Sequence, residues 1–87
     1  MTYYVVVKGK AESEVKKLPE NYQRRALELF HDLASDPVPR TGYDIVRMEG
    51  RVDVFRIRIG NIRIVYQVDW SRKLVIILRV AARGHVY

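Results

Sequence analysis

The stretch FRIRIGNIRIVY, residues 55–66, constrains the fold more than any other part of the chain. Apolar and polar residues alternate on both sides of Gly60-Asn61, which is typical of two half-buried β-strands. Glycine tolerates the positive φ that short hairpin turns require, so this dipeptide predicts a two-residue turn. The stretch therefore predicts a β-hairpin with one apolar face and one basic face.

Counting outward from this turn fixes which residues face each other across the hairpin. Arg58 then faces Arg63, because both residues are equidistant from the turn, and like charges in that position repel. A bound anion would relieve the repulsion, whereas the simpler alternative is a solvated strand face whose arginine stems cover apolar neighbours. The other side of the hairpin is predicted to join the core through Phe55, Ile57, Ile59, Ile62, Ile64, Tyr66 and Val68.

A further hairpin is expected to extend the basic face. With a three-residue turn after Asp69, that residue pairs with Lys73, and Arg79 lies beside Arg63. This register sends alternate residues of the last strand into the core, namely Leu74, Ile76, Leu78 and Val80, and leaves Val65, Val75 and Ile77 among the arginines. We favour a phosphate site because several arginines would converge on one open face: Arg56, Arg58, Arg63, Arg79 and Arg83.

The remaining segments predict an α+β fold. Residues 3–7 are β-branched or aromatic, and residues 11–18 and 19–34 have apolar positions at helical spacing. Prolines and a glycine in SDPVPRTG indicate a loop, after which all segments have the character of strands. We expect one strand, two helices and then an antiparallel β-meander, with the helices packed on one face of the sheet and residues 1–87 forming a single domain.

The charge of the chain is unevenly distributed. Residues 1–46 sum to zero, so the whole formal charge of +6 lies in residues 47–87, mostly as arginine. Arginine matches phosphate oxygens with a planar fork, so this bias favours a nucleic-acid partner. The chain has no cysteine and no apolar run long enough to span a bilayer. We therefore expect a soluble cytoplasmic protein without a membrane partner.

The segments FRIRIGNIRIVYQV and LRVAARGHVY together resemble the RelE toxins of toxin-antitoxin systems, in the wider RelE and ParE superfamily. DPVPR and YDIVRMEG resemble the archaeal RelE proteins in particular. The resemblance covers essentially the whole chain. It implies a RelE-like fold and an mRNA interferase, an endoribonuclease that cleaves mRNA in the ribosomal A site and inhibits translation. It also implies a cognate RelB-type antitoxin as partner, beside the ribosome and mRNA.

The resemblance further implies a metal-free reaction, in which the ribose 2′-hydroxyl attacks the adjacent phosphate. The sequence agrees, because it holds two histidines far apart and no cysteine, and we expect no metal or other cofactor. The family pattern implies Arg58, Arg63, Arg83 and Tyr87 as catalytic residues, and the chemistry of its imidazole adds His85 as a further catalytic candidate. The expected RNA-binding residues are Arg51, Arg56 and Arg79.

Two questions stay open at this level. The proton could be moved by His85, whose imidazole titrates near pH 6.5 when unperturbed, or by Tyr87, whose phenol titrates near pH 10. The same basic face would also serve a ParE-like toxin that binds a protein target, or an RNA- or ribosome-binding module that never cleaves.

Overall fold

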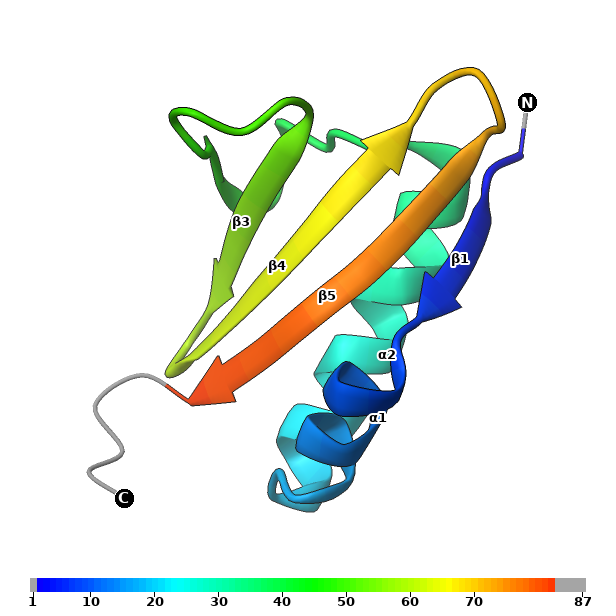
Figure 1. The fold of residues 1–87 in the computed structure, drawn as a ribbon. Helices are drawn as coiled ribbons and strands as arrows, with labels where there is room; N and C mark the ends of the chain where they lie inside the picture. The colour runs from blue at the N-terminus through cyan, green and yellow to red at the C-terminus, as the bar shows by residue number, and fades with distance from the viewer. Residues whose placement is uncertain (1, 83–87) are drawn as a thin grey trace.

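The computed structural model describes residues 2–82 (Figure 1). Its elements are β1 (Tyr4–Val7), α1 (Gly9–Lys16), α2 (Glu20–Ser35), β2 (Asp44–Arg47), β3 (Val54–Ile59), β4 (Ile62–Asp69) and β5 (Leu74–Ala82). The five strands form one sheet in the order β1-β5-β4-β3-β2, and both helices lie on one face of it (Figure 1). This confirms the expected α+β fold. The meander from β2 to β5 is antiparallel as expected, and β1 adds to it in parallel beside β5.

The two helices are separated by Lys17, Leu18 and Pro19. Pro19 precedes the first turn of α2, where its missing N–H costs nothing. The Gln23 side chain donates hydrogen bonds to the carbonyls of Lys16 and Leu18, at 3.1 and 2.8 Å, and so caps the end of α1. From α2, four residues turn into the core: Ala26, Leu29, Phe30 and Leu33.

The hairpin of β3 and β4 has the predicted register. Arg58 pairs with Arg63 and Ile59 with Ile62, on either side of the Gly60-Asn61 turn. The seven apolar residues predicted to share a face are all buried and belong to one core cluster with the helices. The arginines of both strands therefore lie on the face that the helices leave open.

The predicted register of the last hairpin is wrong. Asp69 pairs with Leu74 and not with Lys73, so the turn is one residue longer. The Asp69 carboxylate accepts hydrogen bonds from Ser71 and from the Arg72 N–H, at 2.9 and 3.1 Å, and Lys73 closes the turn with a φ of 57°.

The longer turn exchanges the two faces of β5. Val75 and Ile77 are fully buried in the core, whereas Leu74, Ile76 and Leu78 are half-buried on the open face. A bulge then corrects the phase, because Tyr66 pairs with Ile77 while Val65 pairs with Arg79, which leaves Leu78 unpaired. Val80 consequently faces the core, as predicted.

Two tyrosines fix the loop that leads from α2 into β2. The buried Tyr66 hydroxyl donates a hydrogen bond of 2.8 Å to the Pro37 carbonyl, and the Tyr43 hydroxyl donates one of 2.6 Å to the Asp32 carboxylate. Burial, followed by the neighbouring Asp32, raises the pKa of Tyr43 to about 12. Tyr43 immediately precedes β2, so this bond sets where that strand begins.

The turn of the central hairpin is held against α2. Gly60 has a φ of 54°, and a Cβ there would lie 2.6 Å from the Tyr22 hydroxyl. The same hydroxyl accepts a hydrogen bond of 3.3 Å from the Asn61 N–H. Glycine is therefore favoured at this position by its backbone conformation, which Lys73 also adopts, and above all by the close approach of Tyr22.

We expect Gly60→Ala to lower the free energy of unfolding by about 2–4 kcal/mol, since it combines an unfavourable φ with a steric clash. Gly42→Ala is the matched control, because Gly42 also has a positive φ of 89° but has nothing within 4 Å of the position of a Cβ. That variant should cost only about 1–2 kcal/mol. Urea denaturation measures both, and equal losses would show that the contact with Tyr22 does not constrain the turn.

Candidate nucleic-acid interface

The open face of the sheet carries arginines in two adjacent rows across the strands. One row runs Asp44, Arg58, Arg63 and Ala81, from β2 to β5. The next row runs Val46, Arg56, Val65 and Arg79. Arg79 thus faces Val65 and not Arg63, which corrects the sequence prediction, and the reason is the longer turn and the bulge in β5.

Arg58 is neutralised by a residue of this chain. Its Nε and Nη2 atoms donate to Oδ2 of Asp44, at 3.1 and 2.8 Å, and both side chains are partly exposed. A carboxylate on β2 therefore relieves the repulsion across the hairpin, which the sequence argument had assigned to a bound anion. The sequence offered no signal for this pair, because the loop from β2 to β3 is not a tight turn and does not fix the register.

Arg56 and Arg63 are different, because within residues 2–82 neither has an ion pair or a hydrogen-bond partner for its buried Nε. Both side chains are half-buried, so their stems lie on the sheet. They are diagonal neighbours, since Arg56 faces Val65 and Arg58 faces Arg63. A buried donor without a partner costs about 1–3 kcal/mol, and no ion pair within residues 2–82 neutralises either guanidinium group, so both groups favour an incoming anion.

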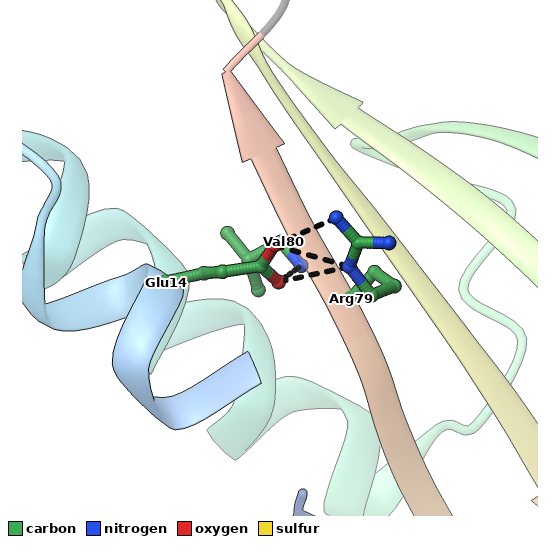
Figure 2. Close-up of polar contacts among 3 residues, drawn as sticks. All are labelled: Glu14, Arg79 and Val80. Atoms are coloured by element: carbon green, nitrogen blue, oxygen red, sulfur yellow. Dashed lines mark hydrogen bonds and ion pairs between the residues drawn. The ribbon is translucent and has the colours of Figure 1, made fainter. Parts of the chain in front are cut away.

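Arg79 is held by a carboxylate from α1 (Figure 2). The Arg79 Nε lies 3.0 Å and its Nη2 2.9 Å from Oε2 of Glu14, while Oε1 accepts a hydrogen bond of 2.8 Å from the Val80 N–H. Burial acts to raise the pKa of Glu14, but the bonds from Arg79 and Val80 outweigh it and the pKa is lowered. The sequence could not reveal this pair, because its members lie on different elements at opposite ends of the chain.

Of the other predicted site residues, Arg51 is described by the structure and does not lie in these rows. Arg51 is exposed in the loop between β2 and β3, at the end of β3 opposite the Gly60 turn. Arg83, His85 and Tyr87 lie outside the described residues. β5 ends with Ala82 opposite Ile62, beside the turn.

The described part of the chain holds neither a cluster of metal ligands nor a membrane-spanning helix. Residues 2–82 contain no group of three or more His, Asp or Glu placed to hold a metal ion. None of the described helices is long and apolar enough to cross a membrane.

The site can therefore bind an anion by two means. Arg56 and Arg63 offer guanidinium donors without internal partners, and their planar forks match the oxygens of a phosphate. Arg58 and Arg79 offer further positive charge that is balanced by Asp44 and Glu14. Such a surface suits a chain of phosphates better than a small enclosed ligand.

The chain is similar to proteins of one family. Residues 5–87 match the family model described as the ParE toxin of the type II toxin-antitoxin system parDE. A RelE1 toxin candidate of Methanocaldococcus jannaschii is 31% identical over 87 residues, which cover 100% of this chain and 97% of that protein.

Solved structures agree with this relationship. RelE in the archaeal RelE-RelB complex from Pyrococcus horikoshii superposes with a TM-score of 0.87 at 35% identity, covering 99% of this chain and 100% of that one. A chain of the RelBE2 toxin-antitoxin complex from Mycobacterium tuberculosis gives 0.76 at 28% identity, covering 95% and 100%. The chain therefore belongs to the ParE/RelE family and is a RelE-family toxin of the type II toxin-antitoxin class.

Proposed function

We propose that this toxin is an mRNA interferase that cleaves mRNA in the ribosomal A site and thereby inhibits translation in the cytoplasm. The observation that carries the proposal is the pair of adjacent guanidinium groups, Arg56 and Arg63, without partners among the described residues on the open face of the sheet. Cationic side chains that lack internal carboxylates are suited to an external phosphate.

The proposed reaction needs no group beyond the protein and the RNA. The ribose 2′-oxygen forms a bond to the adjacent phosphorus and loses its proton, and the bond from phosphorus to the 5′-oxygen breaks as that oxygen gains a proton. The products are a 2′,3′-cyclic phosphate and a 5′-hydroxyl. Negative charge develops on the phosphorane-like transition state between these two events, and Arg56 and Arg63 would stabilise that charge.

The remaining predicted residues would complete the site. Arg58 keeps its guanidinium group fixed through Asp44 and would bind the RNA beside Arg63. Arginine stays protonated too firmly to act as a general base, so the proton needs another group. Arg83 enters the proposal through the family resemblance as a second phosphate cation, and Tyr87 through the same resemblance as a proton carrier. His85 is the rival proton carrier, because of the chemistry of its imidazole.

We also propose a RelB-type antitoxin as partner. The relatives from Pyrococcus horikoshii and Mycobacterium tuberculosis were solved as toxin-antitoxin complexes. The positive charge on the open face calls for a partner with acidic side chains, because complementary charges speed association and set specificity. Such a partner would inhibit the toxin by covering the arginines that the RNA needs.

A second function uses the same face without cleavage. The family model that matches the chain is described as a ParE toxin, so a toxin that only binds its target is the alternative. The ion pair between Arg58 and Asp44 is compatible with this alternative, because a protein that only binds its target can have arginines neutralised by its own carboxylates. Cleavage assays distinguish the two functions.

We expect Arg63→Ala to lower cleavage by about 10²-fold or more, because a fixed cation at the developing charge is lost. Primer extension on mRNA in a translation reaction, with and without ribosomes, measures it. Arg24→Ala is the matched control, since Arg24 is exposed on α2, and it should cleave like the wild type. Thermal stability should be little changed in both variants.

Two results would contradict this proposal. A collapse of thermal stability in Arg63→Ala would identify a structural arginine and not a catalytic one. Wild-type protein that inhibits no translation and makes no ribosome-dependent cuts would favour the binding-only toxin.

The proton carrier can be identified from the dependence of cleavage on pH. We expect either His85→Ala or Tyr87→Phe to lose one limb of the pH-rate profile of cleavage. Loss of a limb near pH 6.5 in His85→Ala would identify the imidazole, and loss of a limb near pH 10 in Tyr87→Phe would identify the phenol. Single-turnover cleavage across pH measures both, and unchanged profiles in both variants would rule out acid-base catalysis by these residues.

A further inference from the structure

The second half of β5 forms an edge of the sheet on the side of α1. β1 pairs with β5 only as far as Ile77, whose carbonyl accepts a hydrogen bond of 3.1 Å from the Lys8 N–H. Beyond that point no strand within residues 2–82 pairs with the Val80 N–H, and the Glu14 carboxylate takes the place of a strand carbonyl (Figure 2). A side chain thus satisfies a backbone donor that a neighbouring strand would otherwise satisfy.

The donors around Glu14 have the arrangement of an anion-binding site. The Nε and Nη2 atoms of Arg79 and the Val80 N–H converge on one carboxylate, with donor-to-oxygen distances of 2.8 to 3.2 Å. A guanidinium fork and a backbone N–H are donors that proteins commonly use for phosphate. Glu14 can therefore be regarded as an internal anion in a site that would also accept a phosphate.

We propose that Arg79 and the Val80 N–H form a second phosphate-binding site for RNA, which Glu14 occupies until an RNA phosphate displaces it. This inference rests on the proposed RNA function, because it takes the ligand to be a phosphodiester. Glu14 then acts as an internal competitor of the RNA. The site lies apart from the unpaired guanidinium groups and would bind a different phosphate of the same strand.

The position of Arg79 allows one RNA strand to reach both sites. Arg79 is in the row of Arg56, with Val65 between them, and is the diagonal neighbour of Arg63, which faces Ala81. Diagonal neighbours on one face of a sheet are about 7–8 Å apart, and arginine side chains span that distance. Phosphates held at Arg56 and Arg63 would place a further phosphate of the strand near Arg79.

The structure has space for the Glu14 side chain once a phosphate displaces it from Arg79. A cavity of about 510 Å³ is lined by Glu14 and Arg79 together with Lys17, Leu18 and Pro19. Lys10 precedes Glu14 by one helical turn, and its charge also lowers the pKa of Glu14. The carboxylate can therefore exchange Arg79 for a lysine of its own helix and avoid being left without a partner.

The exchange favours a chain of phosphates over a single phosphate. The Arg79 side chain is 51% exposed, so its bond to Glu14 is screened by solvent and only modestly stable. A free phosphate in dilute solution still competes poorly with a carboxylate attached to the protein. A phosphate on a strand already bound at Arg56 and Arg63 is present at a high local concentration and competes well.

The test measures binding to a 2′-O-methyl RNA oligonucleotide, which cannot be cleaved by 2′-hydroxyl attack. Glu14→Gln keeps an acceptor for the Val80 N–H but removes the charge that holds Arg79, and we expect it to bind about tenfold more tightly. Glu14→Asp keeps the charge but is too short to hold both donors, and it should also bind more tightly. Adding Arg79→Ala to Glu14→Gln should remove the gain.

Glu12 supplies the matched controls, because it is exposed on the same helix. Glu12→Gln makes the same change in net charge and should alter affinity by less than about twofold. An equal gain in Glu12→Gln and Glu14→Gln would overturn the proposal in favour of a general charge effect. A gain that survives Arg79→Ala, or no gain in either Glu14 variant, would overturn it as well.

Binding and cleavage are measured in separate assays, so this inference and the proposed function can fail independently. A wild-type protein that binds the oligonucleotide but makes no cuts in the primer-extension assay would contradict the interferase, and the Glu14 variants would still support or overturn the second site. Circular dichroism and thermal melting of each variant show whether the fold is kept. A Glu14→Gln variant that has the wild-type fold and binds RNA no better than wild type would leave Glu14 as a structural cap of the β5 edge.

Discussion

The register of the central hairpin is the constraint on which the rest of the structure depends. The two-residue turn sets the register, and the contact of Gly60 and Asn61 with Tyr22 of α2 holds the hairpin against the helices. A slip of one residue would exchange the two faces, because side chains alternate along a strand. Arg58 and Arg63 would then enter the core, and the isoleucines beside them would be exposed. The apolar core and the basic face are therefore consequences of one turn.

The charges on the open face are organised by residues from outside the hairpin. Asp44 balances Arg58 from β2, and Glu14 balances Arg79 from α1. Within residues 2–82 this leaves Arg56 and Arg63 as the guanidinium groups of the face without carboxylates. The number of arginines in the sequence therefore overstates the free positive charge, and placement decides which of them can meet a ligand without first losing an internal partner.

The sequence predicted those parts of the fold that short-range rules control. The Gly60-Asn61 turn, the faces of β3 and β4 and the two helices follow from local spacing, and the structure has them. It failed for β5, since LVIIL is apolar on both faces and the alternation could not choose between a turn of three residues and one of four. The bulge at Leu78 then changed the phase again. The pairs of Arg58 and Arg79 could not be predicted, because they join elements whose contacts depend on the complete fold.

The internal carboxylates also affect the ligand specificity of this surface. A toxin with four free arginines on one face would bind any polyanion, and most of the affinity would come from released counterions. With Glu14 in place, the proposed site at Arg79 would contribute only to a ligand that has already bound Arg56 and Arg63 and that continues along the sheet towards β5. The carboxylate would thus lower the affinity for short or isolated anions more than for an extended strand. An acidic partner would have to meet the same condition, so length and path along the sheet, and not charge alone, would decide what this face binds.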